Sequence, residues 1–346
     1  MKSLFRFVPN VLITIAATTF AVAQVAEDSG LKKWKQGTGW GWVWGADDEV
    51  GSLNELTNAS RLAALQIAAA GEVFDLGVTY DRSSFKWPGH SSGEIMTFRS
   101  PDGVLRQGDF APAKTGTTWH SCALFMNDNV ATQIDGLCHI VEGDDKHWYN
   151  GFTEGDWGGD WGPRKCDATT IPPIVARGVL IDVAGLKGER ALPPHYSITP
   201  DDLRDALARQ KTKLRPGDVV LIRTGTMQFW EDLKDRELLA THDSAGLSLE
   251  GAKWLVEQHG AMMIGSDTTG LEYGPAAEHA EAHQQKYGSF IPVHKYLLVE
   301  QGVHIAECHY LEDLARTQTY EFCYVCSTAK IRGTTAGFAL RPIAIR

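Results

Sequence analysis

The chain has 346 residues, of which 43% are hydrophobic and 22% are charged. This is the composition of a globular protein with a packed core, and it excludes a largely disordered chain. The formal net charge of -10, with no basic run, argues against nucleic acid and anionic membranes as partners.

The N-terminus has the pattern of a secretory signal over residues 1–23. Lys2 and Arg6 precede a short apolar core and a small-residue cleavage site. The apolar core is short for a membrane-spanning helix, although an uncleaved N-terminal anchor is an alternative. We therefore expect an exported protein, periplasmic or secreted, that contacts no membrane after cleavage and has a single domain over residues 24–346.

Tryptophans lie among glycines in the stretch 37–44, which predicts a loop. Aromatic rings on a loop suit a pocket rim or a subunit contact. Trp42 and Trp44 are therefore candidates for substrate binding, with a dimer contact as the alternative. A helix is predicted over 58–70 and a strand over 73–78.

Two long polar excursions are predicted at about 80–116 and 142–173. Such loops in a compact domain are more often functional than idle, and the first has the composition of a lid. A strand is expected between them over 117–126, where His120 is a candidate for substrate binding or a buried core histidine. Candidates for the mouth of a pocket follow in the second excursion: His147, Trp148 and Tyr149.

From residue 178 onward, strand and helix patterns alternate. Strands are predicted over 179–183, 219–224, 261–265, 303–306, 320–324 and 338–345. Helices are predicted after the caps Thr199 and Ser248, and over 292–299 and 311–315. This order, with long inserted loops, predicts one α/β domain built on a mixed β-sheet.

Six cysteines follow the signal, and their disulfide status is open. Cys122, Cys308 and Cys323 sit among apolar or aromatic residues, as buried free thiols do. Cys323 and Cys326 have the spacing of a redox or zinc pair, but they lie in a strand-like run without a second pair. We interpret this pair as structural.

The stretch 129–139 concentrates polar side chains in an apolar neighbourhood. If it is a strand, Asn129, Gln133 and Asp135 share one face, and His139 follows one turn later. Three such residues could bind a ligand, whereas a polar strand face on the surface is the alternative.

Two acidic residues later in the chain follow apolar strands. Glu307 ends the strand 303–306, and an unpaired carboxylate there needs a cation, a metal or a proton. Asp267 also lies at a strand end, where α/β sites often form, with a turn role as the alternative. His279 and His283 have the i, i+4 spacing of a metal pair, but their neighbours favour a solvated helix face.

Several segments together, in this order and spacing, resemble a known family: 47–54, 129–139, 177–182, 216–225, 265–268, 292–294 and 341–344. The chain is similar to the cyclase family that includes bacterial kynurenine formamidase and isatin hydrolase. The similarity runs from about Trp44 to the C-terminus. It implies a mixed β-sheet core flanked by helices, and a homo-oligomer, a dimer or tetramer.

The family motif is His-x-Gly-Thr-His-x-Asp-x-x-x-His, in which the first two histidines and the aspartate bind a metal. Thr132, Asp135 and His139 match this motif, and His139 falls on the histidine that shuttles protons. The two metal-binding histidines fall on Asn129 and Gln133. A later histidine and glutamate, which bind a second metal in some members, fall on His294 and Glu307.

Amide oxygens are weak ligands for zinc and manganese, so this departure weakens the metal site. Asp135, His294 and Glu307 remain, and three protein ligands suffice for one catalytic zinc or manganese ion. Alternatively no metal binds, and these residues with His139 form an acid/base cluster.

The resemblance implies a hydrolase that adds water to the carbonyl of a small amide, cyclic amide or lactone. Asp135, His294 and Glu307 would hold the ion, and His139 would pass a proton to the leaving atom. Asn129 and Gln133 would donate hydrogen bonds to the substrate. The alternatives are a metal-free lyase, isomerase or cyclase, and a non-catalytic small-molecule binding protein.

Overall fold

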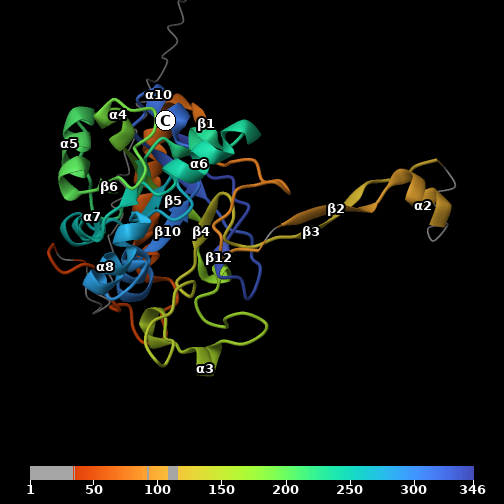
Figure 1. Cartoon of the computed structure of the whole chain (residues 1–346), viewed down its shortest axis with the longest axis horizontal. Helices are drawn as coiled ribbons and strands as arrows, with labels where there is room; N and C mark the ends of the chain where they lie inside the picture. Colours follow the sequence, from red (N-terminus) through yellow and green to blue (C-terminus); the bar gives the residue numbers. More distant parts are fainter. Residues whose placement is uncertain (1–33, 35, 92, 108–115) are drawn as a thin grey trace, which may run out of the picture. The chain divides into compact units, whose positions relative to one another are not determined.

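The computed structural model describes residue 34 and residues 36–91, 93–107 and 116–346, so the expected signal at 1–23 lies outside the described residues. Nine of the described strands form one sheet in the order β1-β13-β11-β5-β7-β9-β10-β4-β12 (Figure 1). Their bounds are β1 (Val73–Asp75), β4 (Gln133–Asp135), β5 (Ile174–Asp182), β7 (Val219–Arg223), β9 (Met263–Ser266), β10 (His304–Glu307), β11 (Glu321–Cys326), β12 (Ala336–Gly337) and β13 (Ile343–Ile345).

The centre of this sheet is parallel and its two sides are antiparallel. β5, β7, β9 and β10 pair in parallel, whereas β11, β13 and β1 on one side and β4 and β12 on the other run antiparallel to their neighbours. Parallel strands are covered on both faces, which is why β7 reads as a run of buried apolar residues. The prediction of one α/β domain on a mixed sheet is confirmed.

The helices follow local start signals that the sequence shows. Thr199 caps α5 with its side chain, Asp202 completes the capping box, and Pro200 opens the helix. The described helices are α1 (Asn58–Ile67), α2 (Pro101–Gln107), α3 (Glu154–Trp157), α4 (Val183–Lys187), α5 (Pro200–Gln210), α6 (Arg236–His242), α7 (Leu249–Lys253), α8 (Ala277–Tyr287), α9 (Pro292–His294) and α10 (Glu312–Arg316).

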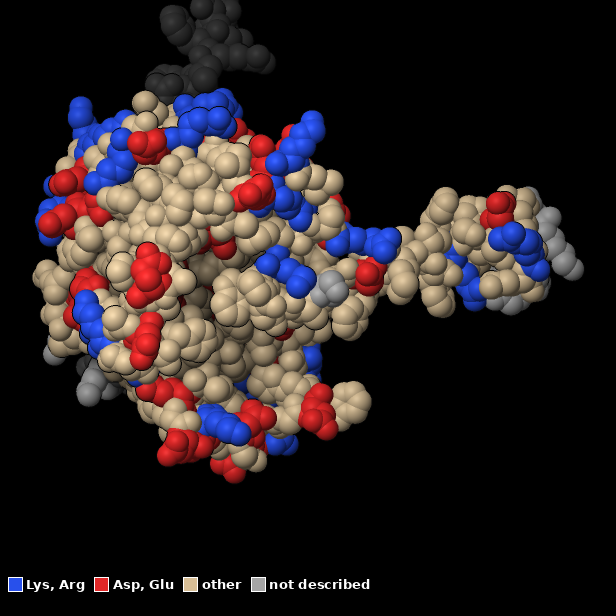
Figure 2. Space-filling view, in the orientation of Figure 1, with Lys and Arg blue, Asp and Glu red and all other residues tan. Residues whose placement is uncertain are grey.

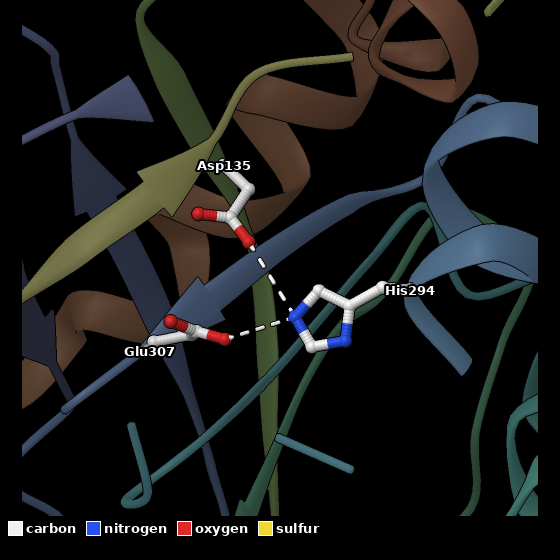
Figure 3. A group of neighbouring side chains, drawn as sticks. All are labelled: Asp135, His294 and Glu307. Carbon is white, nitrogen blue, oxygen red and sulfur yellow. Dashed lines mark hydrogen bonds and ion pairs between the residues drawn. The ribbon is translucent and has the colours of Figure 1, made fainter. Parts of the chain in front are cut away.

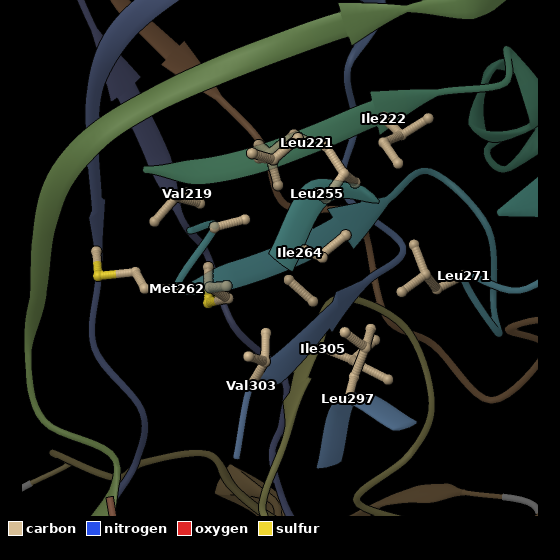
Figure 4. Packing of buried hydrophobic residues seen from close by; sticks show 14 of the residues in the cluster. Val219, Leu221, Ile222, Leu255, Met262, Ile264, Leu271, Leu297, Val303 and Ile305 are labelled. Carbon is tan, nitrogen blue, oxygen red and sulfur yellow. The ribbon is translucent and has the colours of Figure 1, made fainter. Parts of the chain in front are cut away.

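The main core lies between the central strands and the helices that follow them. The helices α7 and α9 each continue into a π-helical turn, at Trp254–Gln258 and Lys295–Glu300. Figure 4 shows Leu255 and Leu297 from these turns among buried side chains of β7, β9 and β10. This packing fixes α9, and therefore His294, against the sheet.

The excursion at 80–116 contains regular structure, so the prediction of a loop there is wrong in part. β2 (Glu94–Arg99) pairs antiparallel with β3 (Ser121–Phe125), and α2 lies between them in the chain. Residues 108–115 lie outside the described part of the chain. A strand pair is set by contacts distant in sequence, which no local pattern reports. Cys122 on β3 is exposed, which corrects the prediction that it is buried.

The central stretch is also corrected, because only Gln133–Asp135 is a strand. Ala131 has φ 62, a left-handed conformation that ends any continuous strand through Asn129. The predicted strand at 338–345 is likewise reduced to β13, with β12 before it. The excursion 142–173 has only short helical turns and α3, as expected of a long loop.

Basic and acidic side chains are interspersed on the face shown in Figure 2. Among the described residues, no helix is long and apolar enough to cross a membrane. All six cysteines are free, and the pair Cys323 and Cys326 lies within β11, as expected of structural residues. Two further short strands, β6 (Ser197–Ile198) and β8 (Gly246–Leu247), form a separate parallel pair.

Candidate active site

Two antiparallel strands bring the central stretch together with Glu307. β4 and β10 pair in the register Glu307↔Gln133 and Ala306↔Ile134. Opposite residues of such a pair share a face, as do alternate residues of one strand. Gln133, Asp135 and Glu307 therefore point to the same side of the sheet, and all three side chains are buried.

His294 completes the group from α9. Figure 3 shows its ring pointing toward Asp135 and Glu307, with Nε2 3.3 Å from Glu307 Oε1 and 3.9 Å from Asp135 Oδ2. The other nitrogen, Nδ1, lies 2.6 Å from Glu272 Oε2. A carboxylate only accepts, so Nδ1 carries the proton. Glu272 also accepts the backbone N–H groups of Val293 and His294, and thus orients the imidazole while capping α9.

The amide group of Gln133 lies between the acidic residues. Its Nε2 is 2.9 Å from Glu307 Oε2, 3.2 Å from Asp135 Oδ1 and 3.3 Å from Asn129 Oδ1. The Asn129 amide donates in turn to the Asp128 carboxylate and to a threonine hydroxyl. Both amides therefore use their N–H donors within the protein. The role of Asn129 and Gln133 in donating to a substrate stays a prediction.

Asp135 and Glu307 place two carboxyl groups close together in a buried environment, where negative charge is destabilised. Burial and the charge of Asp135 raise the pKa of the Glu307 carboxyl to about 8, against the lowering effect of His294. Burial alone would lower the pKa of the His294 imidazole, but hydrogen bonds with Glu272 and Glu307 raise it well above its ordinary value. Without a cation, the cluster therefore retains protons near neutral pH.

The donor set fits one divalent ion. Asp135, His294 and Glu307 each offer one ligand atom, and these atoms lie within 4.8 Å of one another. Asp135 Oδ2 and Gln133 Oε1 are buried oxygens with no hydrogen-bond partner among the described residues. Two carboxylates and an imidazole suit zinc or manganese, and a cation would take the place of the retained protons.

His139 lies in the turn that follows β4 and is half-buried. Its backbone N–H donates to the Gly136 carbonyl at 3.0 Å. Gly136 is required at the start of this turn, because a Cβ there would lie 2.7 Å from the Thr335 carbonyl oxygen. The turn thus places His139 beside the strand that carries Asp135.

Three residues of this region were not predicted from the sequence. Glu272 orients His294, and His304 binds the Asp135 carbonyl through Nδ1 at 2.8 Å. His304 had a usable signal, since a polar residue inside an apolar strand requires partners. The third is His90, whose imidazole is affected by the charges of His139 and Asp135. Glu272 and His90 lie in loops without a local signal.

Asp267 at the end of β9 has a structural role. Its carboxylate accepts the backbone N–H groups of Thr224 and Gly225, each at 2.7 Å, and the Thr224 hydroxyl at 2.8 Å. Burial and the charge of Glu312 raise the pKa of Asp267 to about 6, against the lowering effect of the hydrogen bonds from Thr224 and of the charge of Arg223. The turn role is therefore the one that its contacts support.

The aromatic candidates near the N-terminus contact other elements. Trp42 donates through Nε1 to the Val299 carbonyl at 2.7 Å and leaves 44% of its surface exposed. Trp44 packs on Trp40, with ring centroids 5.6 Å apart. His120 is exposed before β3, which corrects the alternative of a buried core histidine. A role of these side chains in substrate binding stays a prediction.

The predicted pocket mouth is wrong for two of its three residues. Trp148 and Tyr149 are buried in the main core, while His147 is half-buried and pairs with Asp145. Their burial follows from long-range packing that the loop pattern did not show. His279 is exposed on α8, which agrees with a solvated helix face.

Comparisons with known proteins agree with this fold. A Cyclase family model matches residues 74–273. The crystal structure of a novel cyclase superposes with a TM-score of 0.75 at 28% sequence identity, covering 88% of this chain and 96% of that chain. No curated protein matches the chain.

Two isatin hydrolases share the fold at lower identity. Isatin hydrolase A from Labrenzia aggregata, bound to benzyl benzoate, has a TM-score of 0.57 and 19% identity, covering 84% of this chain and 99% of its own. Isatin hydrolase A from Ralstonia solanacearum has a TM-score of 0.56 and 21% identity, covering 84% of this chain and 97% of its own. Because the family model spans more than half of the 346 residues, the chain belongs to the Cyclase family.

Proposed function

We propose that this chain is a hydrolase that adds water to the carbonyl of a small amide, cyclic amide or lactone. The observation that carries the proposal is the buried group of Asp135, His294 and Glu307, with His139 in the adjoining turn. Membership of the Cyclase family supports it. The shared fold with isatin hydrolases, one of them bound to the product analogue thioisatinate, favours a planar substrate.

Asp135, His294 and Glu307 would hold one zinc or manganese ion. Such an ion lowers the pKa of bound water toward neutral and polarises a carbonyl. Nδ1 of His294 donates a hydrogen bond to Glu272, so Nε2 is the nitrogen that would bind the ion. His139 passes a proton to the leaving nitrogen or oxygen.

A metal-free acid/base enzyme is the second candidate, and one observation favours it. The pKa of Glu307 is raised to about 8 by burial and by the charge of Asp135, so its carboxyl can donate a proton at neutral pH without a metal. Such a site suits a lyase, isomerase or cyclase. Metal content separates the two candidates.

The first test is elemental analysis of the purified protein, expressed with zinc and manganese supplied, beside Glu307→Ala. About one equivalent in the parent, lost in Glu307→Ala but kept in the exposed control Glu278→Ala, supports the hydrolase. No metal in the parent contradicts the metal-assisted mechanism and leaves the acid/base candidate.

The second test is turnover of isatin, formanilide and dihydrocoumarin. His139→Asn is expected to lower kcat by about 10²- to 10⁴-fold while the protein stays folded. No turnover by the parent, together with tight ligand binding that survives His139→Ala, would indicate a binding protein instead.

The proposal includes export after cleavage near residue 23 and assembly as a homo-oligomer. N-terminal sequencing of the mature protein tests the first, and light scattering tests the second. A mature protein that begins at Met1 would contradict export by a cleaved signal.

A further inference from the structure

The segment 78–85 is anchored directly beside the candidate site. The backbone N–H of Val78 donates to Thr132 Oγ1 at 2.9 Å, and that hydroxyl donates to the Cys308 carbonyl at 2.8 Å. Tyr80 and Phe85 pack against the same buried apolar cluster that contains Cys308. Thr132 directly precedes β4 and Cys308 directly follows β10. The segment 78–85 therefore packs beside the ends of both strands.

The turn that follows is held by its own hydrogen bonds. Lys86 Nζ donates to the His90 carbonyl at 2.7 Å, and the His90 backbone N–H donates to the Trp87 carbonyl at 3.0 Å. Asn127 Nδ2 donates to Ser91 Oγ at 3.3 Å, which ties the turn to a residue two positions before the stretch 129–139. These bonds hold the backbone of the turn that carries His90.

Residues in and beside the site affect the pKa of the His90 imidazole. Burial lowers its pKa and the charge of His139 lowers it further, while a hydrogen bond with the Asn129 backbone and the charges of Asp135 and Asp128 raise it. All four of these residues belong to the central stretch or precede it by one position. The ring therefore contacts the beginning of the stretch that supplies Asp135 and His139.

One ring nitrogen of His90 lacks a partner. Nδ1 is buried and makes no hydrogen bond to any described residue. A buried polar atom without a partner is destabilising unless a ligand or water supplies one. In a neutral imidazole whose other nitrogen donates to the Asn129 carbonyl, Nδ1 is an acceptor, so the N–H group of a bound amide would satisfy it.

We propose that His90 is a substrate-binding residue whose Nδ1 accepts a hydrogen bond from the N–H group of the bound amide. The proposal rests on the proposed function and adds a residue that lies outside the family motif. It also assigns a role to the turn that carries His90.

The activity test compares His90→Ala, His90→Asn and His90→Gln on the best-cleaved compound of the panel. His90→Ala is expected to lower kcat/KM by about 10- to 100-fold. The Asn amide lies near the position of Nδ1 and is expected to restore part of this loss, whereas Gln, which reaches the position of Nε2, is not. The exposed His279→Ala serves as the control, and thermal unfolding checks that each variant is folded.

A binding readout keeps this test independent of turnover. Protein labelled with ¹⁵N-histidine is titrated with 2-aminobenzoate, a planar acid of the product type. The His90 ring signal is assigned by its absence in His90→Ala. A saturable shift of that signal, with the His279 signal unchanged, is the expected result.

The outcomes separate the two proposals. If the parent is active and His90→Ala keeps its kcat/KM within twofold, the role of His90 is refuted and the hydrolase stands. If the parent cleaves none of the panel, the hydrolase fails, and the titration alone decides His90. A His90 signal that does not move with 2-aminobenzoate then overturns the assignment.

Discussion

Replacing Glu307 by Gln removes a buried ionisable carboxyl group with little change in shape. The Glu307 carboxylate accepts from Gln133 at 2.9 Å and faces His294 Nε2 at 3.3 Å. Burial and the charge of Asp135 raise the pKa of this carboxyl from 4.5 to about 8. The folded protein therefore binds this proton more tightly than the unfolded chain does, and the variant lacks the proton altogether.

The sign of the pH dependence follows from that shift. Between pH 4.5 and pH 8 the folded state holds a proton that the unfolded state has lost, so the free energy of unfolding falls as pH rises. From pH 5 to pH 8 this one group contributes a loss on the order of 3 kcal/mol. The raised pKa of His294 acts in the same direction, because its stabilising charge is lost as pH rises.

The assay is urea unfolding of chelator-treated protein at pH 5, 6, 7 and 8. The parent is expected to lose on the order of 3 kcal/mol more than Glu307→Gln over this range. Glu278→Gln, which changes an exposed carboxylate on α8, is expected to follow the parent. Added zinc or manganese should then stabilise the parent at pH 8 and leave Glu307→Gln unchanged.

Parallel curves for the parent and Glu307→Gln would refute this reasoning. They would mean that Glu307 ionises in the folded protein as easily as in the unfolded chain. Equal stabilisation of both proteins by the metal would show that the ion binds elsewhere.

In Glu272→Gln, one acceptor oxygen remains of the two that bind His294 and the N-terminus of α9. We therefore expect the free energy of unfolding to fall by about 1–2 kcal/mol and the metal affinity to fall by about 10- to 100-fold. Urea unfolding and calorimetric titration measure these two effects, and an unchanged metal affinity would argue against an orienting role. Asp267→Asn places an amide before the N–H groups of Thr224 and Gly225, and we expect a loss of about 1–3 kcal/mol without any change in metal content. A loss of metal in that variant, with stability retained, would contradict its structural role.

The sequence by itself determined the elements whose causes are local. The box of Thr199, Pro200 and Asp202 fixes where α5 begins, because each contact spans three residues or fewer. Continuous apolar runs such as β7 predicted the buried strands. The resemblance to the family motif also selected Asp135, His294 and Glu307, which the fold does bring together.

Only the tertiary structure decided what surrounds these three residues. Gln133 and Glu307 are 174 positions apart in the sequence, and they are in contact because β4 pairs with β10 in one register. No local pattern encodes that register. The left-handed Ala131 breaks a strand that side-chain alternation alone would extend. Glu272 reaches the site from a loop, where position depends on packing against distant segments. Local propensity chose the elements of this protein, whereas contacts between distant residues determined the composition of its candidate site.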